Sequence, residues 1–288
     1  MRRTLLTGTV LALATLGASA CAQAPAPGAQ DAHAGAVAGA NAGVAARWSQ
    51  SRQMVVVTTA GWDATQGELR RFEREDGGAW HANGVAMPVV IGRTGAAWGT
   101  GLHDVPAGDG GPVKHEGDGR SPAGVFAIGE AFGYASTADT GLAYEALDAN
   151  DWCVDVDGSP YYNQIVDSTD VGAGAVKDST EPMRRDLHAG GDQRYRLGFV
   201  IANNPRNARG GGSCIFGHLW KSPDSTTAGC TAMAPESMAA LLHWLDAGKR
   251  PVFVLLPDAE YARLRAAWKL PDLAANAADA ADAAESQA

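Results

Sequence analysis

The apolar residues of this chain fall mostly into short runs that predict β-strands. Runs rich in valine, isoleucine and aromatic residues, separated by segments with glycine, proline or aspartate, are typical of strands. Such runs occupy residues 54–59, 86–91, 124–128, 197–202 and 252–256. Pro88 lies within the second run. Because proline cannot donate a ladder hydrogen bond, we expect that strand at the edge of its sheet.

One segment follows helical rather than strand periodicity. Its apolar residues recur at intervals of three and four, which places them on one helix face. They are Met238, Leu241, Leu242 and Leu245. Pro235 suits the first turn, where a missing N–H leaves no helical hydrogen bond unmade, and Gly248 suits the end. The fold class predicted from these patterns is mainly β with a few helices.

The N-terminus, residues 1–21, has the pattern of a secretory signal peptide. Two arginines precede an apolar stretch and the small residues A-S-A at positions 18–20. The stretch is shorter than the roughly 20 residues that span a membrane. Cys21 follows directly, so two outcomes are open: plain cleavage, or a lipoprotein signal in which Cys21 carries the lipid. Both predict export to the periplasm or cell envelope, with membrane attachment only through that lipid.

Composition divides the rest of the chain into three parts. Residues 22–47 are dominated by alanine, glycine and proline and contain no aromatic residue, which predicts a flexible tether. Residues 271–288 form an acidic, alanine-rich tail. The remaining residues, 48–270, suit one catalytic domain with its own core. The net charge of -9, part of it in the tail, argues against a nucleic-acid partner, which requires a basic face.

Residues 213–233 carry the side chains best suited to catalysis. An apolar run leads into His218, a polar loop follows, and Gly229 and Cys230 precede the predicted helix. A thiolate is a strong nucleophile, and a nearby imidazole lowers the pKa of the thiol or accepts its proton. The backbone amides of Ala228 and Gly229 adjoin that thiol, where they would hold a developing oxyanion. We predict Cys230 as the nucleophile and His218 as general base and acid.

These residues resemble the signature of the YkuD-type L,D-transpeptidases. That family places a histidine after an apolar strand, then a loop, then [Ser/Thr]-x-Gly-Cys before a helix and a last apolar strand. The corresponding residues are His218, Thr227, Gly229 and Cys230. A second segment, residues 114–126, is similar to the family's G-D-x-[Thr/Ser]-P-x-G-x-F motif. The resemblance extends over about residues 55–257, with no matching motif between 152 and 196.

The resemblance implies a YkuD-like, β-rich catalytic domain that needs no cofactor or metal and acts on peptidoglycan stem peptides. Cys230 would attack the carbonyl of the third-position diamino acid of a tetrapeptide and expel the terminal D-alanine. An amine or water would then release the acyl-enzyme. Two other functions stay open. One is a hydrolase, either an L,D-carboxypeptidase or an enzyme that cuts cross-links. The other is a catalytically silent peptidoglycan-binding protein.

Three departures from the family pattern bear on substrate binding. Many members have histidine before the Gly-Cys, arginine two residues after the cysteine, and glycine after the first histidine. This chain has Ala228, Ala232 and Leu219 at these positions. Because an anionic stem peptide needs a cation, we expect a replacement for the missing arginine among Arg120, Lys114, Arg184 and Arg185. Trp220, close after His218, is a candidate wall of the substrate groove.

The histidines and cysteines also permit a zinc site as an alternative. Zinc binds thiolate and imidazole ligands, and the candidate set is Cys214, His218, Cys230 and His243. This set lacks a Cys-x-x-Cys pair, and helical periodicity already accounts for His243. The other histidines in the predicted domain lie in glycine-rich or charged segments, which predicts solvated loops. They include His103, His115 and His188.

Two cysteines remain once Cys21 is assigned to the signal and Cys230 to catalysis. They are Cys153 and Cys214. An oxidising periplasm favours a disulfide between them, which would tie the unmatched middle of the chain to the segment that carries His218. The alternative is a pair of buried thiols that act as small apolar residues.

Overall fold

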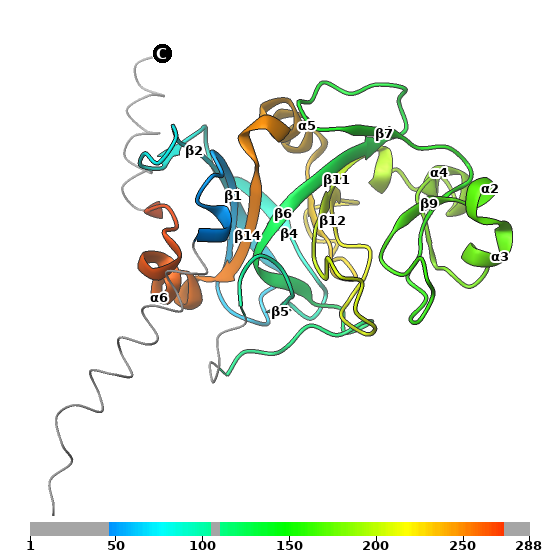
Figure 1. Cartoon of the computed structure of the whole chain (residues 1–288), viewed down its shortest axis with the longest axis horizontal. Helices are drawn as coiled ribbons and strands as arrows, with labels where there is room; N and C mark the ends of the chain where they lie inside the picture. The colour runs from blue at the N-terminus through cyan, green and yellow to red at the C-terminus, as the bar shows by residue number, and fades with distance from the viewer. Residues whose placement is uncertain (1–45, 105–109, 274–288) are drawn as a thin grey trace, which may run out of the picture. The chain divides into compact units, whose positions relative to one another are not determined.

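The computed structural model describes residues 46–104 and 110–273 (Figure 1). The predicted signal peptide, including Cys21, and residues 22–45 of the tether lie outside the described residues, as do residues 274–288 of the tail. Among the described residues, no helix is both long enough and apolar enough to cross a membrane.

The main sheet closes on itself as a barrel. Its strands follow the order β1-β14-β6-β11-β12-β13-β4-β2, and β2 returns to pair with β1. Each of these strands therefore has a neighbour on both sides, which protects its backbone from pairing with another chain. The strands are β1 (Gln53–Thr59), β2 (Gln66–Glu73), β4 (Met87–Val90), β6 (Ser121–Gly133), β11 (Leu197–Ile201), β12 (Phe216–Leu219), β13 (Thr231–Met233) and β14 (Val252–Pro257). Outside this ring, β3 (His81–Ala82) extends β2, and β5 (Ala96–Trp98) and β7 (Tyr144–Ala146) pair with β6.

Apolar side chains fill the barrel and also cover part of its outside. β1 and β14 are buried along their whole length, because α6 (Asp258–Trp268) packs on them from outside (Figure 1). The carbonyl of Trp268 accepts the indole N–H of Trp48 at 3.1 Å, which joins this helix to η1 (Ala46–Trp48). The continuous apolar runs of β1 and β14 are thus strands that are buried on both faces.

The predicted class, mainly β with a few helices, is confirmed. α5 (Pro235–Trp244) begins at the predicted proline, but its predicted end at Gly248 was wrong. Leu245 already has an extended backbone and is fully buried, because the chain turns there to place this side chain in the barrel core. Gly248 lies in the next turn, η3 (Ala247–Lys249).

The expectation that residues 86–91 form an edge strand was also wrong. β4 lies between β13 and β2 in the barrel. β13 is short and pairs only with Val89 and Val90, so Pro88 has a single strand partner, Glu68 of β2. A proline is therefore tolerated inside the closed sheet because it lies beyond the end of one neighbour.

A smaller unit, residues 147–196 and here called the insert, lies between β7 and β11. It consists of a sheet in the order β10-β8-β9 and short helices, which Figure 1 shows to one side of β11 and β12. Its elements are β8 (Asp151–Cys153), β9 (Ile165–Asp167), α2 (Ser168–Val171), α3 (Ala173–Val176), β10 (Glu181–Pro182), α4 (Arg185–His188) and η2 (Arg194–Arg196). A disulfide joins Cys153 of the insert to Cys214, with Cα atoms 5.9 Å apart.

His103 was expected in a solvated loop, and this was wrong because its side chain is only 4% exposed. Its ring lies over Gly124, where a Cβ atom would come within 1.9 Å of the ring. Gly124 has a φ of +134°, which favours glycine. The rings of Phe126 and Trp268 pack around the imidazole at centroid distances of 5.4 and 5.5 Å. Burial lowers the pKa of His103 to about 4, so it is a neutral core residue.

Candidate active site

His218 lies on β12, and Cys230 directly precedes β13, the adjacent parallel strand of the barrel. In the register of β12 and β13, His218 is opposite Ala232, which places Cys230 beside Phe216. Alternate residues of a strand share a face, so the thiol and the imidazole project from the same side of the sheet. This is the outer side, against the insert, because Leu219 alternates with them and belongs to the barrel core.

The thiol of Cys230 is buried and held by the backbone. The residue is 7% exposed, and its Sγ accepts the N–H of Phe216 at 3.3 Å and donates to the carbonyl of Cys214 at 3.4 Å. Cys214 is bridged to Cys153. The carbonyl that orients the thiol is therefore covalently tied to the insert.

The two sequence motifs meet at the backbone of Cys230. Ser121, from the first motif, and Thr227, from the second, both donate hydroxyl hydrogen bonds to the Cys230 carbonyl, at 3.0 and 2.6 Å. A Cβ atom at Gly229 would lie 3.1 Å from the carbonyl oxygen of Arg120, so glycine permits the close approach of the two segments. Together they fix the position of Cys230.

His218 has the proton arrangement of a general base. Its Nδ1 lies 2.8 Å from the carbonyl oxygen of Leu219. Because a carbonyl only accepts, Nδ1 carries the proton and the neutral ring has its lone pair on Nε2. The ring of Tyr195 packs edge-on against the imidazole, with centroids 5.3 Å apart. The sequence alone could not identify this orienting carbonyl.

Comparison with known protein families identifies the family of this chain. A family model of the L,D-transpeptidase catalytic domain, YkuD, matches residues 70–254. The chain belongs to the YkuD family. The match includes both sequence motifs. It also includes the insert, in which the sequence showed no motif of the family. No curated protein and no solved structure matches the chain.

Burial sets the resting charge state of this YkuD site. It raises the pKa of the Cys230 thiol to about 12, with a further contribution from the carboxylate of Glu181. It lowers the pKa of His218 to about 4, and Arg194 acts in the same direction. The resting pair is therefore a neutral thiol and a neutral imidazole, so nucleophilic attack by this sulfur would require its proton to leave.

We expect alkylation of Cys230 by iodoacetamide to accelerate about tenfold per pH unit between pH 7 and 9.5, without a plateau. The thiolate fraction rises tenfold per unit below the pKa of the thiol, which burial raises to about 12. The rate is measured by intact-mass analysis of the native protein without substrate. A plateau with an apparent pKa between about 5 and 7 would instead indicate a preformed thiolate–imidazolium pair.

The two backbone N–H groups predicted to bind an oxyanion, those of Ala228 and Gly229, differ in their surroundings. The N–H of Gly229 donates to Oγ1 of Thr227 at 3.1 Å, so binding an oxyanion there requires this bond to be exchanged. Ala228, on the same turn, is exposed. The Ala228 side of this turn is therefore open to solvent, whereas the Gly229 N–H is already engaged.

The cations predicted from the sequence to contact substrate all have acidic partners in this YkuD domain. The pairs are Arg120 with Asp63, Lys114 with Asp118, Arg184 with Asp186, and Arg185 with both Glu181 and Asp192. Lys114 is buried, and its charge lowers the pKa of the Cys230 thiol. These residues hold the loops and the insert in place around the thiol.

The insert contributes residues to the site that no motif indicated. The hydroxyl of Tyr195 donates to Oε1 of Glu181 at 2.7 Å, and Arg185 donates to the same oxygen at 2.8 Å. The charge of Glu181 in turn raises the pKa of the Cys230 thiol. The signal in the sequence was the density of arginine between residues 184 and 196, which by itself does not distinguish a structural network from a site.

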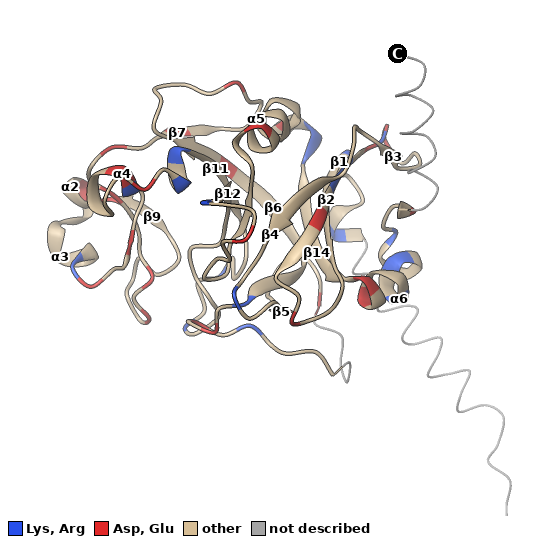
Figure 2. Ribbon diagram, turned by 180° about the vertical axis from the view of Figure 1, so that it is seen from behind, with Lys and Arg blue, Asp and Glu red and all other residues tan. Residues whose placement is uncertain are grey.

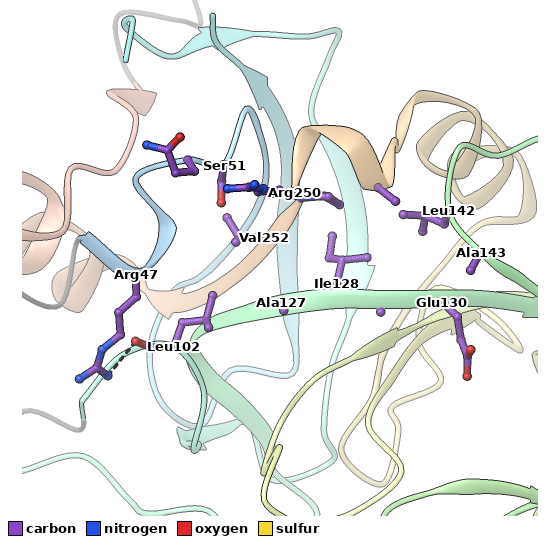
Figure 3. A pocket seen from close by; sticks show the side chains of 14 residues that line it. Arg47, Ser51, Leu102, Ala127, Ile128, Glu130, Leu142, Ala143, Arg250 and Val252 are labelled. Atoms are coloured by element: carbon purple, nitrogen blue, oxygen red, sulfur yellow. Dashed lines mark hydrogen bonds between the residues drawn. The ribbon is translucent and has the colours of Figure 1, made fainter. Parts of the chain in front are cut away.

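A pocket of about 400 Å³ begins at Leu219, the residue after His218, and Trp220 is among its lining residues. A second cavity, of about 430 Å³, lies elsewhere, between β6, β14 and the N-terminal turn, with Arg47, Ile128 and Arg250 among its labelled residues (Figure 3). None of its lining residues belongs to β12 or β13. The first pocket thus lies closer to the candidate site along the chain, and a third cavity, of about 330 Å³, is lined by Cys214 and Phe216, whose backbone contacts the thiol.

The zinc alternative was wrong. Cys214 forms a disulfide, so its sulfur is not a thiolate ligand. His243 is exposed on α5, and its Nδ1 lies 2.8 Å from the carboxylate of Asp139. The predicted ligand set is thus not assembled.

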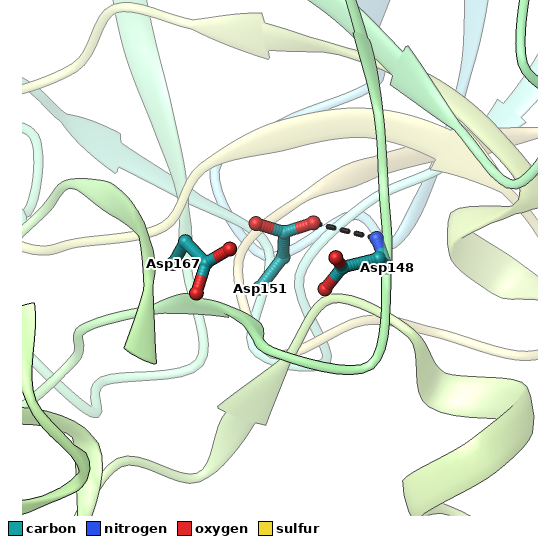
Figure 4. Close-up of side chains that lie close together, drawn as sticks. All are labelled: Asp148, Asp151 and Asp167. Carbon is teal, nitrogen blue, oxygen red and sulfur yellow. Dashed lines mark hydrogen bonds between the residues drawn. The ribbon is translucent and has the colours of Figure 1, made fainter. Parts of the chain in front are cut away.

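An acidic cluster in the insert is accounted for by turn formation. Asp148, Asp151 and Asp167 lie together, with one ligand atom of each within 4.8 Å of the others (Figure 4). Asp151 accepts the backbone N–H of Asp148, and Asp148 accepts that of Asn150, both at 2.6 Å. Asp167 caps α2 through Thr169. These backbone N–H donors account for the clustering of the three carboxylates, and no bound cation is needed to explain it.

Proposed function

We propose that this YkuD domain is an L,D-transpeptidase that acts on peptidoglycan stem peptides through an acyl-enzyme at Cys230. The observation that carries the proposal is the hydrogen bond from His218 Nδ1–H to the Leu219 carbonyl. It leaves the basic lone pair on Nε2, and the strand register puts this ring on the same face as the thiol. An oriented imidazole next to a cysteine is the arrangement of a nucleophile and its base.

The proposed reaction begins with attack of Sγ on the carbonyl carbon of the third residue of a tetrapeptide, while His218 Nε2 takes the thiol proton. The N–H of Phe216, which already donates to Sγ, stabilises the charge that develops on sulfur. The C–N bond to the terminal D-alanine then breaks, and His218 returns the proton to the departing amine. This leaves a thioester on Cys230.

The second half of the reaction releases the acyl group. The amine of an acceptor stem peptide attacks the thioester carbonyl, His218 accepts a proton from that amine, and the C–S bond breaks. The proton returns to sulfur, which restores the neutral thiol that burial favours. Water in place of the amine gives a tripeptide instead of a cross-link. The export predicted from residues 1–21 would bring the enzyme to this substrate in the periplasm.

Product analysis with a disaccharide-tetrapeptide tests the proposal. The exported protein should release D-alanine and yield a cross-linked dimer, with a transient increase in the mass of the protein equal to the acyl group. Release of D-alanine with only tripeptide formed would identify an L,D-carboxypeptidase instead. Binding without release of D-alanine and without a covalent adduct would identify a non-catalytic peptidoglycan-binding protein and overturn the proposal.

A further inference from the structure

The pocket of about 400 Å³ that begins at Leu219, directly after His218, has two different walls. Leu219 and Trp220, which directly follow the histidine, form one wall with Pro235 at the start of α5. The end of the insert, residues 189–196, forms the other. A larger cavity of about 670 Å³ shares Arg196, Leu219 and Pro235 with it, so the two adjoin and Arg196 lines both. A peptide chain that reaches Cys230 along β12 would pass this point.

The pocket carries an excess of positive charge. Its charged residues are Asp192, Arg194, Arg196 and Lys221. Asp192 is neutralised by Arg194 and by Arg185 outside the pocket. Arg196 and Lys221 are exposed, and across the described part of the chain neither side chain has an ion pair or hydrogen bond. In Figure 2, basic residues lie between α4 and β12.

The position of the family's usual arginine cannot supply this charge. Ala232 is 1% exposed and is paired with His218 on one side and Val90 on the other. Because alanine is uncharged, this position supplies no positive charge to the face of the sheet that carries the thiol. The two unpaired cations of the pocket lie instead beside Leu219 and Trp220, which directly follow His218.

We infer that Arg196 and Lys221 bind a carboxylate of the peptidoglycan donor peptide. This inference rests on the proposed function and names the residues that select its substrate. A carboxylate fits because Arg196 offers a planar pair of donors and Lys221 adds a point charge. The donor's carboxylates include that of the terminal D-alanine and, where the diamino acid has one, that of its side chain. Both present the same chemistry to the pocket.

Kinetics of the exported protein with Arg196→Gln and Lys221→Gln test the inference. The double variant should lower kcat/KM for a tetrapeptide donor with free carboxylates roughly tenfold or more, mainly through a higher KM, because a charge-assisted contact that is present before reaction affects binding. With a donor amidated at the bound carboxylate, wild type and variant should differ by less than about threefold. Amidating one carboxylate at a time identifies which group is bound.

The controls separate this inference from the proposed function. Lys177→Gln removes an exposed lysine in the insert that is not in the pocket and should leave both constants unchanged. Arg196→Lys keeps the charge and should recover part of the lost affinity. If wild type does not turn over the tetrapeptide, the proposed function fails. If wild type turns it over and the double variant has unchanged KM for every donor, only the assignment of Arg196 and Lys221 is overturned.

Discussion

Cys230→Ala is expected to abolish release of D-alanine from a tetrapeptide donor and to abolish covalent acylation of the protein. Sγ is the only part of the site placed to form the thioester in the proposed reaction, and removing the nucleophile of a catalytic unit costs on the order of 10⁶ in kcat. Intact-mass spectrometry with the donor should show an adduct on wild type and none on the variant. Turnover in the variant should fall below detection.

The matched control is His218→Ala, which keeps the thiol and removes its base. We expect its turnover to fall about 10²–10⁴-fold, while iodoacetamide still modifies Cys230. Both variants should retain the cooperative thermal unfolding of wild type, since the barrel core does not depend on either side chain. Measurable acyl-enzyme in a folded Cys230→Ala protein would show that the nucleophile has been assigned to the wrong residue.

The second large effect is expected from the disulfide between Cys153 and Cys214. The double variant Cys153→Ser, Cys214→Ser should lose about 2–4 kcal/mol in the free energy of unfolding, because the bridge closes a loop between residues 61 positions apart. Its kcat should fall more than its KM rises, since the Cys214 carbonyl accepts the S–H of Cys230. Urea denaturation and steady-state kinetics measure the two effects.

Reduction of the bridge in the Cys230→Ala background provides the control for stability. It removes the same cross-link without exposing the catalytic thiol to exchange, so its loss of unfolding free energy should match that of the serine pair. A double variant with unfolding free energy within about 1 kcal/mol of wild type would contradict the loop-closure argument. Unchanged kcat would contradict the positioning of the thiol through Cys214.

The sequence by itself determined the features that depend on local patterns. The valine-rich runs of β1 and β14 are strands because β-branched residues suit extended backbone, and Pro235 begins α5 because proline suits the first turn of a helix. Cys230 and His218 were predicted as nucleophile and base from the single segment, residues 213–233, that contains both. The mainly β class and the YkuD family followed from the same residues, and both were confirmed.

Only the tertiary structure decided what depends on pairing between distant segments. Pro88 lies in the closed barrel because β13 ends before it, and His103 is buried because Gly124 leaves room for its ring. The acceptor that orients His218 is the backbone carbonyl of Leu219. Because every residue has a backbone carbonyl, no sequence motif could indicate this one. The ion pairs of the predicted cations and the unpaired charges of Arg196 and Lys221 arise where the insert meets the barrel. A sequence shows which residues carry a charge, but only the fold determines which of those charges are paired with an opposite one.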